Sequence, residues 1–158
     1  MAIRCASKAI IIESGAVLLN RCRREDGSVY YDLPGGGQKL YESMEQTLFR
    51  EVMEETGYEI RVERFVGLAE EINTSEELRK RYPEYTHRIL HIFTASLIGE
   101  KKDIPTEKDL HMEESVWLPL DEIDDLQETR PSCLKQLLRD IRKDERARFY
   151  GTEYREEE

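Results

Sequence analysis

The stretch from Pro34 to Tyr58, PGGGQKLYESMEQTLFREVMEETGY, decides the fold, because a run of helix-breaking residues shortly precedes the strongest helical pattern in the chain. The run of one proline and three glycines predicts a loop. Ser43 and Gln46 form a capping-box pattern, which predicts that a helix begins after Ser43. Gly57 stands where a left-handed C-terminal cap belongs, so we expect the helix to end at Thr56.

Three glutamates crowd one face of the predicted helix. Glu51, Glu54 and Glu55 fall within an arc of about 100°, where like charges repel one another. Leu48 and Val52 border this face, so the carboxylates should be partly desolvated, which raises the cost. A concentration of carboxylate oxygens is what a hard divalent cation requires. The alternative is an ordinary solvated face, which the glutamate-rich composition favours when the cluster is taken alone.

The glycine-rich loop supplies a second part of the pattern. Its residues let backbone atoms approach a ligand without side chains in the way. We expect a carbonyl of this loop to complete the coordination of the cation, since Mg²⁺ takes few protein oxygens and keeps other positions for water and substrate phosphate. The loop and helix together therefore indicate a metal-dependent site for phosphate chemistry.

The flanking segments predict a sheet with helices packed on it, which is an α/β fold. Strand patterns occupy residues 2–12, 16–22, 29–33, 58–72, 87–98 and 115–118. An amphipathic helix is predicted at residues 131–141, which closes a domain of residues 1–142. The charged residues 143–158 are expected to form a flexible tail or a frayed helix.

Composition excludes several classes of function. The chain has 158 residues, with 24 Lys and Arg against 34 Asp and Glu, which gives a net charge of −10. This acidity argues against binding of nucleic acid polymers or anionic membranes. We find no signal peptide and no apolar run long enough to span a membrane. The three scattered cysteines fit reduced thiols, so we expect a cytoplasmic protein.

Taken as one pattern, the central stretch resembles a known sequence signature. Gly36, five residues, Glu42 and seven residues precede the segment Arg50-Glu51-Val52-Met53-Glu54-Glu55-Thr56-Gly57-Tyr58. This spacing resembles the complete Nudix box, with each of its fixed residues present and Tyr58 in place of an aliphatic residue. The order of the flanking elements is also similar to that family over residues 2–141.

The resemblance implies the Nudix fold, an α/β/α sandwich around a mixed β-sheet. It implies hydrolysis of a nucleoside diphosphate linked to another moiety, such as a nucleoside triphosphate or a related nucleotide, with Mg²⁺ or Mn²⁺. No downstream signal of a subfamily is present, so the chain is similar to MutT-type proteins in general. The alternatives are an ADP-ribose or nucleotide-sugar hydrolase, and a Nudix-fold module that binds a nucleotide without cleaving it.

The resemblance also implies roles for single residues. By position, the metal ligands are Glu51, Glu54, Glu55 and the carbonyl of Gly36. Glu42 and Arg50 match a supporting ion pair that orients the ligand helix. With Glu51, Glu54 is the expected catalytic residue, and it is the first candidate for the base that deprotonates water. Glu113 and Glu114 are the alternatives for that base.

Substrate contacts and assembly rest on weaker patterns. Arg4 on the first predicted strand, Arg79 and Arg81 in a basic cluster, and Glu114 are candidates for substrate binding. Each of them also fits an ordinary solvated charge. We expect a nucleotide-type small molecule as the substrate. Many members of the family are homodimers, so a homodimer is favoured.

Overall fold

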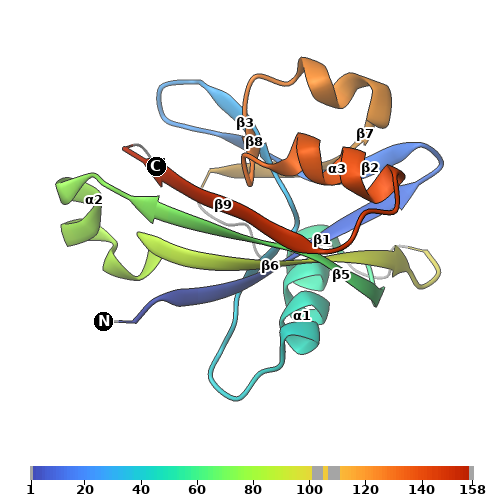
Figure 1. Cartoon of the computed structure of the whole chain (residues 1–158), viewed down its shortest axis with the longest axis horizontal. Coiled ribbons are helices and arrows are strands. Elements are labelled where there is room, and N and C mark those ends of the chain that lie inside the picture. The colour runs from blue at the N-terminus through green and yellow to red at the C-terminus, as the bar shows by residue number, and fades with distance from the viewer. Residues whose placement is uncertain (1, 101–104, 107–110, 157–158) are drawn as a thin grey trace.

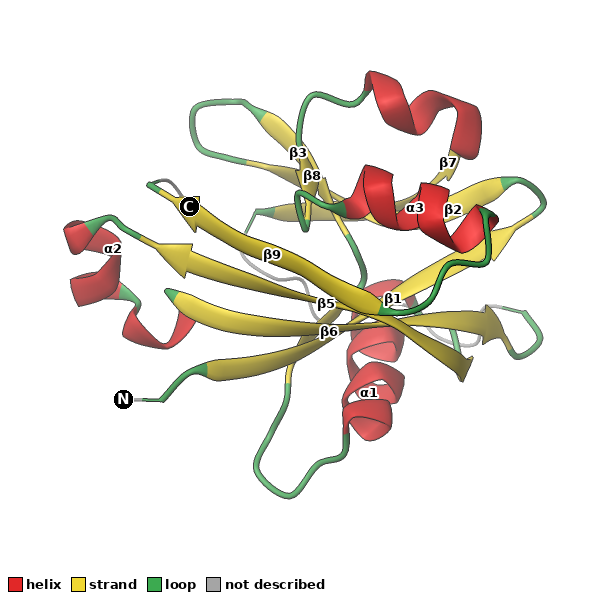
Figure 2. Ribbon diagram, in the orientation of Figure 1, coloured by secondary structure: helices red, strands yellow, loops and turns green. Residues whose placement is uncertain are grey.

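The chain is built around one mixed β-sheet with helices on both faces (Figures 1 and 2). The structure is a computed structural model that describes residues 2–100, 105–106 and 111–156. Its strands are β1 (Arg4–Glu13), β2 (Ala16–Arg23), β3 (Val29–Asp32), β4 (Gly35–Gly37), β5 (Ile60–Asn73), β6 (His87–Leu97), β7 (Met112–Pro119), β8 (Thr129–Arg130) and β9 (Arg148–Arg155). Its helices are α1 (Met44–Thr56), α2 (Glu76–Arg81) and α3 (Leu134–Arg142), with short 3₁₀ turns η1 (Pro83–Tyr85) and η2 (Leu120–Asp125).

The strand order explains why the sheet is mixed. Among the described residues the order is β8-β3-β2-β1-β6-β5-β9, with β4 beside β1 and β7 beside β2. β1 pairs with β6, β3 with β8 and β5 with β9 in parallel, and the remaining pairs are antiparallel. In the part of the chain that is described, no helix combines the length and apolarity needed to cross a membrane.

The central strand β1 separates two cores, because successive side chains of a strand point to opposite faces. Ile10 lies in a buried cluster with Leu134 of α3. Its neighbour Ile11 lies in a second cluster with Leu48 and Val52 of α1. The sheet is therefore covered by α3 on one face and by α1 on the other (Figure 2), and the predicted α/β/α sandwich is confirmed.

The glycine-rich segment is a strand, so the prediction of a plain loop is wrong. β1 and β2 separate after two residue pairs, and β4 occupies the resulting fork by pairing antiparallel with β1. A side chain would prevent this pairing, because a Cβ atom on Gly35 would overlap the carbonyl oxygen of Ser7. The φ of Gly35 is also 131°, which favours glycine. The fork places Gly36 directly beside α1.

The C-terminal segment is also ordered, which corrects the prediction of a flexible tail or frayed helix. β9 pairs in parallel with the long strand β5 and covers its edge (Figure 1). Its arginines have partners elsewhere in the chain. Arg148 and Tyr150 both donate hydrogen bonds to Asp140 of α3, at 3.1 and 2.5 Å. Residues 157 and 158 of the predicted tail lie outside the described part.

Candidate active site

Helix α1 begins and ends at the predicted caps. The N–H of Gln46 donates to Ser43 Oγ at 3.1 Å, and Gln46 Oε1 accepts from the N–H of Ser43 at 2.8 Å. Gly57 adopts a φ of 77°, and its N–H donates to the carbonyl of Met53 at 2.9 Å. The capping box and the left-handed cap therefore fix the length of the helix, as local sequence predicts.

Arg50 connects the glycine-rich strand to the acidic face of the helix. Its Nε and Nη2 donate to the two carboxylate oxygens of Glu42 at 2.8 and 3.0 Å, so the pair is bidentate. Nη2 also donates to the carbonyl of Gly37 at 3.1 Å. Nη1 donates to Glu51 at 2.5 Å and to Glu54 at 3.4 Å. The guanidinium therefore fixes the positions of both carboxylates relative to β4.

These contacts also fix the ionisation of the Glu42–Arg50 pair. Hydrogen bonding to Arg50 lowers the pKa of Glu42 to about 2, and the N–H of Lys39 and the hydroxyl of Thr47 add two more donors. Donation of these hydrogen bonds to Glu42 in turn raises the pKa of Arg50. Both groups are charged at neutral pH, so this end of the helix is held by a full ion pair.

Glu51 lies against the backbone of β4. A Cβ atom on Gly36 would stand 2.5 Å from the carboxylate carbon of Glu51, so only glycine leaves room for this approach. The Glu51 side chain is 14% exposed and lines a cavity with Gly36. The Glu51 carboxylate and the backbone of Gly36 in β4 thus meet at the wall of one cavity.

Glu55 is turned into the protein interior and is 2% exposed. Its Oε2 accepts a hydrogen bond from Asn20 Nδ2, and its Oε1 accepts one from the N–H of Gly35 at 3.3 Å. Ser115 Oγ donates to Asn20 Oδ1 at 2.9 Å and so orients that amide. In this structure Glu55 ties α1 to β2 and β4.

The chemistry of these donors fits a hard divalent cation, because carboxylate and carbonyl oxygens are its preferred ligands. Because Gly36 has no side chain, the Glu51 carboxylate can lie beside the backbone of β4. This arrangement suits a cation that is bound by both residues. Among the described residues, however, no three Asp, Glu, His or Cys side chains are gathered as a metal-binding group. Glu51 and Glu54 share Arg50, so binding of a cation would require these carboxylates to exchange the guanidinium for the ion.

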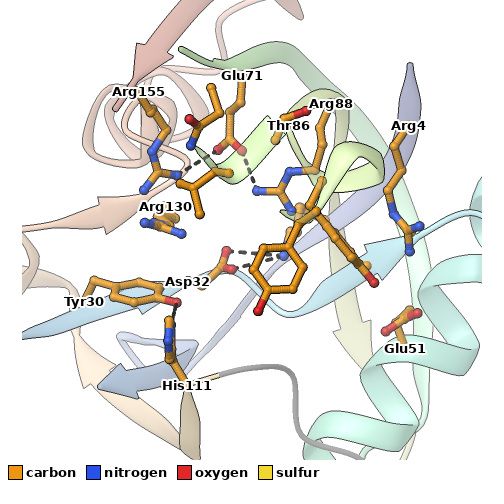
Figure 3. A pocket seen from close by; sticks show the side chains of 17 residues that line it. Arg4, Tyr30, Asp32, Glu51, Glu71, Thr86, Arg88, His111, Arg130 and Arg155 are labelled. Carbon is orange, nitrogen blue, oxygen red and sulfur yellow. Dashed lines mark hydrogen bonds and ion pairs between the residues drawn. The ribbon is translucent and has the colours of Figure 1, made fainter. Parts of the chain in front are cut away.

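A cavity of about 440 Å³ opens beside Glu51, within the size range of small-molecule sites. Figure 3 shows Glu51 at one end and Glu71 with Arg155 at the other. Its basic lining residues outnumber the acidic ones. They are Arg4, Lys8, Arg88, Arg130 and Arg155, against Asp32, Glu51 and Glu71. In a chain with a net charge of −10, this cavity is locally cationic and suits an anionic ligand.

The predicted substrate contacts are divided by the structure. Arg4 lines the cavity, where Figure 3 shows it on the side of Glu51. Arg79 and Arg81 lie on the exposed helix α2, outside the lining. Glu113 and Glu114 pair with arginines of β2 and also lie outside the lining. Of the four candidates for substrate binding, Arg4 is therefore the one that the fold brings to the cavity.

Sequence reasoning missed most of the charged cavity residues, although one signal was present. Lys8 interrupts an apolar strand, and the structure buries it, with its Nζ donating to Asp32 and to two carbonyl groups. Glu71 and Arg88 are charged residues within strand patterns, and they face each other directly in the β5–β6 ladder. A charge inside an otherwise apolar strand was the signal that could have identified Lys8. Arg155 gave no such signal, because its segment was expected to be flexible.

Comparisons with known proteins agree with this architecture. A family model described as the NUDIX domain matches residues 4–141. A NUDIX hydrolase from Nitrosomonas europaea is 21% identical, with a TM-score of 0.71, over 92% of this chain and 93% of that chain. A MutT protein from Bacillus halodurans is 21% identical, with a TM-score of 0.66, over 94% of this chain and 90% of that chain. An ADP-ribose pyrophosphatase from Streptococcus suis is 19% identical, with a TM-score of 0.62, over 94% of this chain and 99% of that chain.

Proposed function

Because this chain belongs to the Nudix family and is a hydrolase of phosphoric anhydride bonds, we propose that it cleaves a nucleoside diphosphate linked to another moiety. The substrate is a nucleoside triphosphate or a related nucleotide, and Mg²⁺ is the cofactor, with Mn²⁺ as a substitute. One observation carries this proposal. Glu51, on the glutamate face of α1, meets the glycine-rich strand at the wall of a cationic cavity.

We assign the ion to Glu51, Glu54, Glu55 and the carbonyl of Gly36. When bound, a divalent ion neutralises phosphate oxygens and makes a water molecule more acidic. Arg50 releases the carboxylates for this purpose but stays fixed by its bidentate pair with Glu42. The ion pair thereby keeps the helix in register with β4 in both states.

The protein residues then divide the remaining work. Glu54 accepts the proton of the water that attacks phosphorus in line, since its side chain is 23% exposed and therefore reachable by water. The anhydride P–O bond breaks, and its electron pair leaves with the departing phosphate. Arg4 lines the same cavity near Glu51, and its guanidinium suits a substrate phosphate oxygen.

The test is product analysis with a substrate panel. The purified protein is incubated with Mg²⁺ and with nucleoside triphosphates, ADP-ribose and nucleotide sugars, and the released phosphate compounds are separated by chromatography. ADP-ribose is included because one solved structure of the same fold is an ADP-ribose pyrophosphatase. Release of a nucleoside monophosphate from one of these compounds supports the proposal. Binding of a nucleotide without any product would favour the alternative of a Nudix-fold sensor module.

Location and assembly are separate proposals. Cys5, Cys22 and Cys133 are free thiols, which supports a reducing cytoplasm as the site of action. The expected homodimer rests on the family resemblance. Size-exclusion chromatography with light scattering tests it, since a mass of 18.6 kDa would identify a monomer.

A further inference from the structure

The end of the cavity opposite Glu51 holds a buried carboxylate between two arginines. Glu71 is 5% exposed and lies directly across the β5–β6 ladder from Arg88. Its Oε2 accepts a hydrogen bond from Arg88 Nη2, and its Oε1 lies 3.9 Å from Arg155 Nη1 (Figure 3). Among the described residues, none donates a hydrogen bond to Glu71 Oε1. A buried acceptor without a donor is costly, so this oxygen points to a donor supplied by a ligand.

Arg155 reaches this cavity because β9 is fixed in place. Its side chain is 14% exposed although it stands near the C-terminus. The carbonyl of Arg155 accepts hydrogen bonds from the N–H and the hydroxyl of Thr74, at 2.6 and 3.0 Å. Arg155 also lies beyond residues 4–141, which the family model matches. The C-terminal strand therefore adds to the domain a cavity residue that the family match does not include.

Aromatic side chains line the same cavity. Tyr82 and Tyr85 come from the segment between β5 and β6, and the guanidinium of Arg4 lies 4.8 Å from the ring centroid of Tyr85. Tyr30 comes from β3, with the guanidinium of Arg130 at 4.2 Å from its ring centroid. Aromatic and guanidinium faces of this kind suit a planar group that stacks.

The acceptor on Glu71 distinguishes two kinds of ligand. A second phosphate group offers hydrogen-bond acceptors and negative charge, and it would lie against the Glu71 carboxylate. A nucleobase edge offers acceptors for arginine N–H groups together with an N–H donor for Glu71 Oε1. Its faces can stack on the tyrosines. The charge and hydrogen-bonding pattern therefore favour a base over a further phosphate.

We propose that Arg88, Glu71 and Arg155 form the base-recognition end of the substrate cavity and that strand β9 completes it. This inference rests on the proposed nucleotide substrate and adds which residues select it. Glu71 accepts an N–H of the base, and Arg155 donates to an acceptor on the same edge. Discrimination among substrates thus depends on a strand outside the segment that the family model matches.

The test is a binding titration without metal, followed by NMR spectra of the ¹⁵N-labelled protein. The probes are AMP, GMP, CMP and UMP, with ribose 5-phosphate and inorganic pyrophosphate for comparison. At least one nucleotide should bind about tenfold or more tightly than ribose 5-phosphate, the difference being the base contacts. If no nucleotide binds more tightly than ribose 5-phosphate, the inference is overturned.

The variant Glu71→Gln decides between a base and an anion by the sign of its effect. Loss of the carboxylate charge should weaken the preferred nucleotide about tenfold and leave ribose 5-phosphate unchanged, because an N–H bonds more strongly to a charged acceptor. If the site held a second phosphate, the same variant would bind pyrophosphate and every nucleotide more tightly. Unchanged or tighter nucleotide binding would overturn the inference.

A matched pair of arginine variants tests the role of β9. Arg155→Gln should weaken the preferred nucleotide about tenfold. Arg148→Gln changes the same residue type on the same strand, but this arginine pairs with Asp140 and lies outside the cavity lining. It should leave nucleotide binding unchanged, and the spectra themselves report whether each variant is folded. Equal effects of the two substitutions would overturn the role of Arg155.

These experiments can contradict the proposed hydrolase function and the proposed base recognition independently of each other. A nucleotide that binds through Glu71 and Arg155 but is never cleaved with Mg²⁺ contradicts the proposed function and leaves base recognition intact. Cleavage of nucleotides that bind no more tightly than ribose 5-phosphate contradicts base recognition and leaves the hydrolase intact.

Discussion

The carboxylate of Glu51 lies so close to Gly36 that a Cβ atom on this glycine would stand 2.5 Å from the carboxylate carbon. The contact joins the strand in the β1–β2 fork to the acidic face of α1. It brings together the backbone of Gly36 and the carboxylate of Glu51, and both residues belong to the proposed ligand set. The geometry at this contact can be changed with a single methyl group.

Gly36→Ala is expected to displace the Glu51 carboxylate and lower kcat/KM by about 10²-fold, a typical cost of misplacing a catalytic group by about 1 Å. The measurement is Mg²⁺-dependent hydrolysis together with the melting temperature. Gly99→Ala is the control, because a Cβ atom there meets nothing within 4 Å, so only backbone strain is added. Near-wild-type kcat/KM in Gly36→Ala would show that the close approach is not needed.

Arg50→Ala should reduce both stability and turnover. It removes hydrogen bonds to three carboxylates, those of Glu42, Glu51 and Glu54, and to the carbonyl of Gly37, so we expect a loss of about 1–3 kcal/mol in the free energy of unfolding. Arg50→Lys should not restore activity, because an ammonium group cannot form the bidentate pair with Glu42. Denaturant unfolding and steady-state kinetics measure the two effects.

Arg139→Ala provides the matched control for this ion pair. Arg139 pairs with Asp124 at 3.0 Å, but the two side chains are 50% and 69% exposed. Such surface pairs contribute about 0–1 kcal/mol, so stability and kinetics should stay close to wild type. If Arg50→Ala behaved like Arg139→Ala, Glu42 and Arg50 would not be a support for the ligand helix.

Asp140→Asn should loosen β9 in a pH-dependent way. The hydroxyl of Tyr150, together with Gln136 and Arg148, holds the pKa of Asp140 below its usual value. A depressed pKa in the folded state stabilises the protein above the unfolded pKa, about 3.9 for Asp, and this stabilisation is lost as the pH falls through the folded pKa. The melting temperature of Asp140→Asn should therefore lie below wild type at pH 7, and the difference should shrink below about pH 4. A difference that is constant from pH 7 to pH 3 would contradict the assigned hydrogen bonds.

Removal of divalent metal should abolish hydrolysis without unfolding the protein. The two cores on either side of β1 consist of apolar side chains and contain none of the proposed ligands. Glu55 is buried, but it lies outside both clusters. EDTA should therefore stop turnover, leave the far-UV circular dichroism spectrum unchanged, and be reversed by excess Mg²⁺ or Mn²⁺. Turnover that persists in EDTA would rule out the proposed cofactor.

Local features of this protein could be predicted from sequence, because they depend on residues close together in the chain. Ser43, Gln46 and Gly57 act within one helix, and Glu42 with Arg50 are eight positions apart. The helix bounds followed from these short spacings, and the ion pair was implied by the resemblance to the Nudix box. The glycine-rich strand did not follow, since its pairing depends on the fork between β1 and β2, which is a property of the whole sheet.

The cavity was beyond sequence reasoning for a similar reason. Glu71, Arg88 and Arg155 meet only because β6 and β9 flank β5, and nothing in the local sequence around Arg155 specifies a parallel pairing with a strand some 80 residues earlier. Charge and polarity at residues 143–158 suggested solvation. In the structure Arg148 pairs with Asp140, and Arg155 lies near Glu71 with only 14% of its side chain exposed.

The decisive measurement compares two glutamine variants of one helix in Mg²⁺-dependent hydrolysis of the best substrate of the panel. Glu54→Gln removes the proposed base and ligand, while Glu45→Gln alters an exposed glutamate in the first turn of the same helix. We predict that Glu54→Gln loses at least about 10²-fold in kcat with an unchanged fold, and that Glu45→Gln matches the wild type. Wild-type turnover by Glu54→Gln would contradict the assignment of the active site to the unit formed by β4 and α1.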